Sequence, residues 1–347
     1  MLDTIYVVHH SHTDIGFTHD QPIFWELQAR FINDALHLIE DYASKHPAAS
    51  AFRWTIETTC GLEAWLKTAQ ASDIDRLVWA EKNGYLEVTA MFANITPLLD
   101  IPQLIESLRP MQRLRTEFGF DVRYAMNCDV NGQNWTLADV LLDAGIEGFS
   151  MAINHHFGGP PDPRPNVFLW QAPSGRTLPA HNGWQYSKAT DFGLGDETDE
   201  RFMEWLPRIE AYLDEIHYPL PFIMLEGFHP FGDNGSAWNA YAEFARRWNE
   251  SGRTPHLITA TPRMFWERVK NHQAELNTLR GDWTDYWNFG CISAARETTI
   301  ARSVRQRLYR ADAISALAPQ PRHDRSAQQR QEAWRNLILY GEHTWGA

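Results

Sequence analysis

The sequence alternates between short apolar runs and longer segments in which apolar residues recur every three or four positions. Short runs rich in Val, Ile, Phe and Tyr, bounded by polar or turn residues, are typical of buried β-strands. This pattern predicts seven strands, over residues 4–9, 52–57, 85–91, 123–129, 147–153, 221–227 and 256–260.

The segments between these strands have the periodicity of amphipathic helices. In residues 23–46 the apolar positions from Ile23 to Tyr42 are spaced three or four apart, which places them on one buried face. Pro110 should kink or split the helix that precedes Gly119, because proline lacks the N–H that the helix interior needs. Further helices are predicted over residues 73–84, 101–119, 135–145, 200–216 and 236–252.

Strands that alternate with helices predict parallel strands joined by right-handed crossovers. About seven such units favour an α/β fold built as a (β/α)7-type barrel of seven parallel strands. Residues 154–188 interrupt the rhythm with a Pro/Gly-rich loop and a hairpin that turns at residues 173–175, which we expect to lie over the barrel mouth. The pattern then changes to two long helices, 297–318 and 326–342. We therefore expect a barrel over residues 1–275 and an incomplete, truncated helical bundle over residues 276–347.

Composition removes several classes of function. The chain has 31 Lys and Arg against 44 Asp and Glu, a net charge of −13, which argues against a nucleic-acid partner. Neither a leader peptide nor an apolar run of about 18 residues is evident, so we predict a cytoplasmic protein without a membrane partner. The three cysteines lack CxxC spacing and suggest neither a disulfide framework nor a thiolate zinc site.

Polar residues gather where the predicted strands end. In barrels and open α/β sheets, ligands bind beyond the carboxyl ends of the strands, because the connecting loops converge there. The amino ends carry fewer candidates, with Asp3, Arg53 and Tyr124. The residues at or after the carboxyl ends are His12, Asp14, Glu57, Asn94, Asp129, Asn154, His155, His229 and Asp233.

Three short motifs supply candidate chemistry. His12 and Asp14 are two residues apart, so in an extended segment they project to the same side, and their N and O donors suit a divalent cation such as Zn²⁺. The alternative is a hydrogen-bonded core histidine. Asp129, in NCDVNG, suits a nucleophile, a metal ligand or a helix cap. Asp233, in FGDNG, is either held over the rim by flanking glycines or part of a turn.

These motifs together resemble the catalytic domain of the glycoside hydrolase family 38 α-mannosidases, in a divergent bacterial branch. HSHTDIGF resembles the family signature H-S-H-N-D-P-G-W, and NCDVNG and FGDNG resemble the segments that bear the nucleophile and the acid/base. EHTWG, near the end of the chain, resembles a late histidine segment, and GDWTDYWNFG, residues 281–290, also matches this branch.

The resemblance implies a retaining glycosidase that acts on α-mannosides or related α-glycosides. It implies one Zn²⁺ held by His12, Asp14, Asp129 and His343. Asp129 would be the nucleophile and Asp233 the acid/base. The remaining candidates are substrate-binding residues: Phe17, which replaces the family's Trp, together with Glu57, Asn94, His155, Trp184, Tyr186 and His229. For Trp184 and Tyr186, simple packing is the alternative. C-terminal β-sandwich domains are expected in the full-length protein.

Other interpretations stay open at this point. An HxH motif after the first strand also begins metal-dependent amidohydrolase-like barrels, but these need an Asp after the last strand, and HLITATP offers none. A polysaccharide deacetylase shares a seven-stranded barrel and a His/Asp metal site, but its HxxxH spacing is missing. A non-catalytic carbohydrate-binding barrel is a third alternative, which the presence of both Asp129 and Asp233 disfavours.

Overall fold

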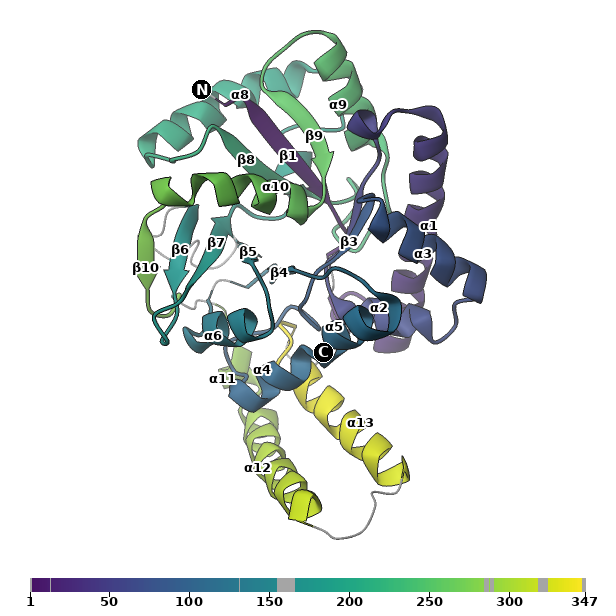
Figure 1. Ribbon diagram of the computed structural model, residues 1–347, viewed down its shortest axis with the longest axis vertical. Coiled ribbons are helices and arrows are strands. Elements are labelled where there is room, and N and C mark those ends of the chain that lie inside the picture. The colour runs from purple at the N-terminus through teal and green to yellow at the C-terminus, as the bar shows by residue number, and fades with distance from the viewer. Residues whose placement is uncertain are drawn as a thin grey trace.

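The structure is a computed structural model of the 347-residue chain and describes residues 2–12, 14–130, 132–154, 166–283, 287, 290–317 and 324–344 (Figure 1). All seven predicted strands are confirmed, although the inner ones are shorter than expected. They are β1 (Thr4–His9), β2 (Trp54–Ile56), β3 (Leu86–Val88), β4 (Tyr124–Met126), β5 (Gly148–Ala152), β8 (Phe222–Gly227) and β9 (His256–Ala260). The predicted hairpin is present as the antiparallel pair β6 (Val167–Gln171) and β7 (Thr177–Gly183). Its predicted place over the strand ends was wrong, because β7 pairs in parallel with β5 within a sheet.

The described strands form three small sheets, and one of them is mixed. Their orders are β8-β1-β9, β10-β6-β7-β5-β4 and β2-β3, where β10 (Thr278–Arg280) is a strand that the sequence pattern did not predict. Every strand pair except β6 and β7 is parallel. A parallel bridge between His10 and Thr55 connects β1 to β2, and the Ala90 N–H donates to the Tyr124 carbonyl (3.0 Å) between β3 and β4. The mixed α/β class is confirmed, whereas a single seven-stranded barrel stays a prediction.

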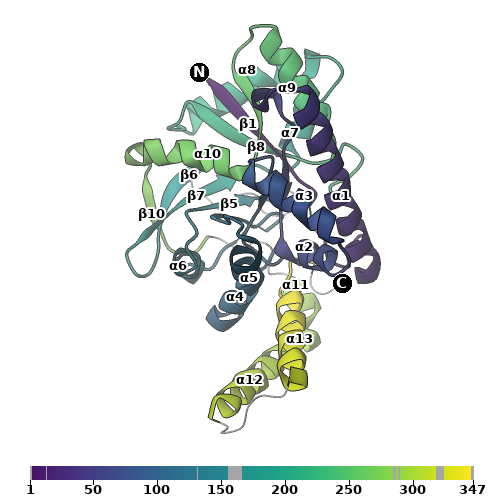
Figure 2. The same ribbon diagram turned by 45° about the vertical axis from the view of Figure 1, so that its right-hand side comes forward.

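Helices pack around these sheets and hold the strand ends in place (Figures 1 and 2). The long first helix buries Phe31, Ala35 and Tyr42, as the periodicity predicts, whereas Ile23, at the start of the predicted face, is 48% exposed. The predicted helix over residues 101–119 is split at Pro110, as expected, and Gly119 ends it in the left-handed region (φ +70°). The body helices are α1 (Gln21–Lys45), α2 (Thr59–Leu66), α3 (Ala71–Lys82), α4 (Ile101–Ser107), α5 (Arg109–Arg113), α6 (Thr136–Asp143), α7 (Lys188–Asp191), α8 (Glu200–Glu215), α9 (Ala240–Glu250) and α10 (Pro262–Val269), with 3-10 turns at Ala48–Ser50 and Lys270–Glu275 and a π-turn at Leu114–Phe118.

Two long helices near the end of the chain project from this body (Figures 1 and 2). They are α12 (Ala295–Leu317) and α13 (Asp324–Tyr340), preceded by the short α11 (Gly290–Ser293), so the predicted helical region is present. Leu308, Trp334 and Leu337 form a small apolar cluster between α12 and α13. The main core lies in the body, where β2 to β7 pack against α1, α2, α3 and α6. No helix in the described ranges has the length and apolarity that crossing a membrane requires.

Candidate metal centre

His12 and Asp14 lie directly beyond β1, where the strand leaves the sheet. The Val7 and Val8 side chains anchor β1 in the core, and the chain then turns through the polar segment that begins at His10. His12 is fully buried and Asp14 is 7% exposed. His9, which precedes the motif, is a satisfied core residue, because its ring nitrogens are bonded to the Gly227 carbonyl and the Trp238 amide. Burial lowers the pKa of His9 to about 3.

Asp129 reaches the same place from the end of β4. Its backbone has φ +59°, a left-handed conformation that Asp adopts more readily than most residues. The Asp129 amide donates to the Ala152 carbonyl (2.8 Å), and its Oδ1 accepts from Asn154 Nδ2 (2.7 Å). These two bonds to the end of β5 leave Oδ2 directed at His12 and His343.

His343 comes from the far end of the sequence, 331 residues after His12. After α13 the chain re-enters the body, where Glu342 forms an antiparallel bridge with Ile95 in the loop after β3. The His343 amide donates to the Asn94 carbonyl (2.8 Å), and the Thr96 amide donates to the Gly341 carbonyl (2.9 Å). This added backbone pairing places the His343 ring beside His12.

The four side chains form one compact set of donors. His12, Asp14, Asp129 and His343 are all buried, and a ligand atom of each lies within 4.8 Å of the others. His12 Nε2 is 3.2 Å from His343 Nε2, 3.7 Å from Asp14 Oδ1 and 4.0 Å from Asp129 Oδ2. His343 Nε2 is 3.0 Å from Asp14 Oδ1 and 3.4 Å from Asp129 Oδ2. Donors around a tetrahedral zinc ion, with bonds of about 2.0 to 2.2 Å, are separated by about 3.3 to 3.6 Å, so the set fits such a cation.

Two further carboxylates fix the orientation of the imidazoles. Glu57, at the end of β2, contacts His12 Nδ1 (3.0 Å), and Glu342 contacts His343 Nδ1. In both rings Nε2 therefore faces the other donors. A carboxylate on the outer nitrogen of a metal-binding histidine is the usual arrangement in metal sites, where it fixes the tautomer and raises the basicity of the ligand.

The charges within this cluster shift the pKa values strongly. Burial disfavours the imidazolium, but the nearby carboxylates, above all Glu57, outweigh it and raise the pKa of His12 to about 9. Burial also opposes ionisation of Glu57, yet His12 and His10 lower the pKa of Glu57 to about 2. The pKa of Asp14 is held well below its usual range against burial by His343 and His12. Surplus negative charge of this kind attracts a divalent cation, which competes with protons for the same lone pairs.

Asn234 connects the FGDNG loop to this centre. Its Nδ2 donates to Asp14 Oδ2 (2.9 Å), and its Oδ1 accepts from the Asp14 amide (3.3 Å). Thr18 Oγ1 also donates to Asp14 Oδ2 (3.1 Å). With one oxygen held in this way, Asp14 presents Oδ1 to His343.

Asp233 stands next to the four clustered donors. Its carbonyl accepts from the His12 amide (2.9 Å), and its Oδ2 accepts from the Tyr186 hydroxyl (3.3 Å). The Tyr186 ring stacks on the His12 ring with 4.4 Å between centroids. Tyr186 is itself buried, and burial raises its pKa, as do the Asp129 and Asp233 charges. Asp233 therefore contacts the tyrosine that stacks on His12.

The other predicted substrate-binding residues have varied surroundings. Asn94 is fully buried and accepts from the Cys128 amide (2.9 Å), so it orients the Asp129 and His343 segments. Phe17 is 74% exposed, and His229 lies on the loop before Asp233. Trp184 packs against Tyr212 and Phe192, with centroids 5.4 and 5.9 Å away. His155 lies outside the described residues. A role for these five in binding substrate stays a prediction.

Several residues that the sequence interpretation did not assign to the site support it. Glu342, Asn127, Asn234 and Thr18 all hold a ligand or its loop; Asn127, for example, bonds both the amide (2.8 Å) and the carbonyl (2.9 Å) of Ile95. Three of the four stand inside the quoted motifs, in EHTWG, NCDVNG and FGDNG. The sequence signal that could have identified these three residues is that each is polar and stands within one or two positions of a candidate site residue in its motif.

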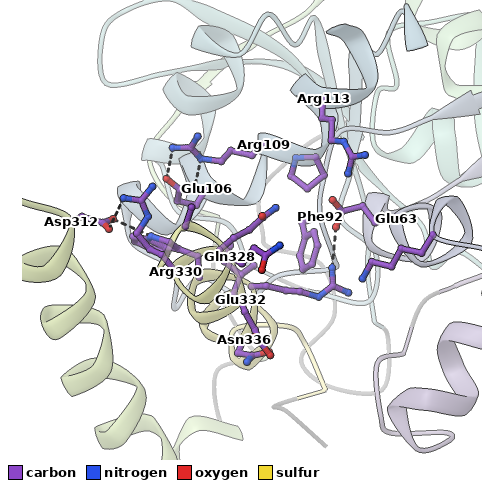
Figure 3. A pocket seen from close by; sticks show the side chains of 17 residues that line it. Glu63, Phe92, Glu106, Arg109, Arg113, Asp312, Gln328, Arg330, Glu332 and Asn336 are labelled. Carbon is purple, nitrogen blue, oxygen red and sulfur yellow. Dashed lines mark hydrogen bonds and ion pairs between the residues drawn. The ribbon is translucent and has the colours of Figure 1, made fainter. Parts of the chain in front are cut away.

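A cavity of about 1070 Å³ lies elsewhere, between α13 and the α2 and α5 side of the body (Figure 3). Two ion pairs lie among its charged side chains: Arg335 with Glu63 (3.0 Å) and Arg330 with Asp312 (3.5 Å). Phe92 lies among them. None of the four clustered donors lines this cavity.

Comparison with known proteins agrees with this geometry. The model of the glycosyl hydrolases family 38 N-terminal domain matches residues 3–288. The chain therefore belongs to glycosyl hydrolase family 38. The comparison with curated proteins found no match.

Solved structures share the fold. An α-mannosidase from Enterococcus faecalis V583 has a TM-score of 0.69 at 14% identity, covering 99% of this chain and 39% of that one. A family 38 glycosyl hydrolase from Enterococcus faecalis has a TM-score of 0.65 at 11% identity, covering 100% of this chain and 36% of that one. A family 57 branching enzyme from Thermococcus kodakaraensis has a TM-score of 0.59 at 11% identity, covering 99% and 84%. The chain thus spans less than half the length of its family 38 neighbours.

Proposed function

We propose that the protein is a metal-dependent retaining glycosidase that acts on α-mannosides or related α-glycosides. The observation that carries the proposal is the convergence of His12, Asp14, Asp129 and His343 at the strand ends of a family 38 fold, with Asp233 adjoining them. The α-mannosidase named among the structural neighbours supports the substrate class. The same proposal includes the seven-stranded barrel predicted from the sequence, formed by β1, β2, β3, β4, β5, β8 and β9.

Each aspartate has a distinct role in this proposal. Asp129 attacks the anomeric carbon, since Asn154 fixes one of its oxygens and leaves the other on the metal-binding side. Asp233 gives a proton to the leaving oxygen and then removes one from water. Tyr186 donates to Asp233 and keeps that carboxyl oriented across from the histidines.

His12, Asp14, Asp129 and His343 would hold the cation, for which we propose zinc. When bound, it supplies positive charge at the nucleophile and at the sugar hydroxyls, which favours ionised Asp129 and the distorted sugar ring. Glu57 and Glu342 keep the two imidazoles turned inward throughout.

The test is hydrolysis of aryl α- and β-glycosides by the 347-residue chain, with zinc and after chelation. We expect zinc-dependent release from an α-mannoside or a related α-glycoside, with the α-anomer as the first product in proton NMR. Asp129→Asn should reduce kcat by at least about 10³-fold, in line with removal of a covalent nucleophile. Asp143→Asn, a matched change at an exposed ion pair with Arg176, should leave kcat unchanged. Release only from acetylated sugars or phosphate esters would contradict the proposal.

A further inference from the structure

A second group of metal-ligating side chains lies beside the first and has no part in the proposed reaction. His10, Cys128 and Glu226 are all buried, and a ligand atom of each lies within 4.8 Å of the other two. They come from the carboxyl ends of β1, β4 and β8. Because β1 and β8 belong to one sheet and β4 to another, this group joins two sheets across the interior.

The distances within the group fit a tetrahedral ion. His10 Nε2 lies 3.3 Å from Glu226 Oε2, and Cys128 Sγ lies 3.4 Å from the same oxygen. For zinc, with bonds of about 2.0 Å to N and O and about 2.3 Å to S, donor separations should be about 3.3 Å for N to O and about 3.5 Å for S to O. The two separations that involve Glu226 Oε2 thus match those of zinc ligands, and the third, between His10 and Cys128, is within 4.8 Å.

His10 gives an independent indication that a ligand belongs here. Its side chain is fully buried, and neither ring nitrogen makes a hydrogen bond within the described residues. The Glu226 oxygen is close enough to Nε2 but not aligned for such a bond, and Glu57 Oε1 is 3.8 Å from Nδ1. A buried imidazole without a hydrogen bond is costly, whereas coordination would satisfy its lone pair.

The surroundings favour a borderline or soft divalent ion. Met126, Ala152 and the Tyr186 ring pack around Cys128, so the site is dry. Neutral imidazole, thiolate and carboxylate carry two negative charges, which a divalent cation cancels, leaving a neutral unit in the core.

We propose that His10, Cys128 and Glu226 bind a second divalent cation, of the zinc or cobalt class, distinct from the one held by His12, Asp14, Asp129 and His343. Its role is structural, because it holds the ends of β1, β4 and β8 together. Two of its ligands adjoin the first site: His10 stands two residues before His12, and Cys128 stands one residue before Asp129. Nothing in this assignment depends on the glycosidase reaction.

Cobalt titration separates the two sites, because only this one contains sulfur. The metal-stripped 347-residue chain is titrated with Co²⁺ and followed by ultraviolet and visible absorption. We expect two equivalents to bind, with a sulfur-to-cobalt charge-transfer band in the near ultraviolet. Cys128→Ser should abolish the band and remove one equivalent, while the control Cys291→Ser keeps both. Asp14→Asn should remove the other equivalent and keep the band.

Saturation of the wild-type chain without the band, or a band that persists in Cys128→Ser, would overturn the proposal. Circular dichroism checks that each variant is folded. Should Cys128→Ser not fold, the wild-type chain loaded with zinc gives the answer by X-ray absorption: a sulfur shell at about 2.3 Å supports the site, and nitrogen and oxygen shells alone refute it. If the chain lacks glycosidase activity but shows the band, only the proposed function fails.

Discussion

Glu57 follows β2 and Glu87 lies on the neighbouring strand β3, yet their surroundings shift the pKa values of these two glutamates in opposite directions. β2 and β3 pair in parallel, with Thr55 beside Glu87, and Glu57 is the residue after β2. Glu57 is 2% exposed and Glu87 is 3% exposed. The pKa of Glu57 is lowered to about 2, however, whereas burial raises the pKa of Glu87 to about 7.

The difference comes from the partners. Glu57 lies between two imidazoles, with His12 Nδ1 at 3.0 Å and His10 Nδ1 at 3.8 Å. Glu87 points toward α10, where it accepts a hydrogen bond from the Arg263 amide (2.8 Å) at the start of that helix. Two adjacent histidines overcome the cost of burying a carboxylate, whereas a backbone amide does not. A buried acid therefore marks a functional centre only when its partners are themselves ligands or bases.

The largest effect that we expect from this comparison is a change in the free energy of unfolding, caused by ionisation of Glu87. Because its folded pKa lies above the ordinary value of 4.5, the folded state binds the proton more tightly than the unfolded chain does. The free energy of unfolding should thus fall as pH rises from about 4.5 to about 7, by up to about 3 kcal/mol. Glu87→Gln removes this penalty, so the variant should be more stable than the wild type at pH 8 and similar at pH 4. Urea unfolding of the metal-free chain at both pH values measures this difference in the free energy of unfolding.

Glu26→Gln is the control for that experiment, since the Glu26 side chain is 77% exposed and pairs only with Arg30 across one helical turn in the described residues. It should change stability by less than about 0.5 kcal/mol at either pH. An equal difference between Glu87→Gln and the wild type at pH 4 and pH 8 would show that ionisation of Glu87 is not the cause.

The second effect is on the affinity of the site formed by His12, Asp14, Asp129 and His343 for its cation, and Glu57 is the residue that tests it. Glu57→Gln keeps the size of the side chain but removes the charge that orients His12, so metal affinity should fall by about 10- to 100-fold, or about 1.4 to 2.7 kcal/mol. Competition with a chromogenic chelator measures the dissociation constant. Glu87→Gln is the matched control on the adjacent strand and should bind as tightly as the wild type. Equal losses in both variants would mean that the effect is general destabilisation of this pair of strands.

Local pattern predicted most of the elements, because strand and helix periodicity depends on neighbouring residues. It predicted β1 and β9 to the residue and the split at Pro110. It missed β10 and α10, which are short and are held by contacts with distant segments, such as the pairing of Leu279 with Trp170. The amino ends of the strands are also richer in charge than predicted, since Arg123 pairs with Asp121, Glu147 and Glu267.

The residues of the candidate site likewise fall into those that local sequence pattern predicts and those that only distant contacts bring together. His12, Asp14 and Asp129 follow predicted strands, so strand position alone brings them to one edge, whereas His343 was placed by family resemblance. Its approach depends on the bridge between Glu342 and Ile95, which no local pattern contains. The His10, Cys128 and Glu226 group was missed because its members have no characteristic spacing, being brought together only by the fold.

The smallest expected effect is at Asn234, which tests whether hydrogen-bond donors alone tune a buried acid as histidines do. Asn234→Ala removes the donor to Asp14 Oδ2, leaving Thr18 to hold that oxygen. Because Thr18 keeps its bond to the same oxygen, we expect a loss at the lower end of the range for a hydrogen bond to a charged group, about 1.5 kcal/mol. The dissociation constant for the metal should therefore rise by about 12-fold, measured with the same chelator. Asn83→Ala, which removes a bond to the Trp79 carbonyl at the exposed end of α3, is the control and should leave affinity unchanged. Unchanged affinity in Asn234→Ala would mean that Thr18 and His343 are sufficient to orient Asp14.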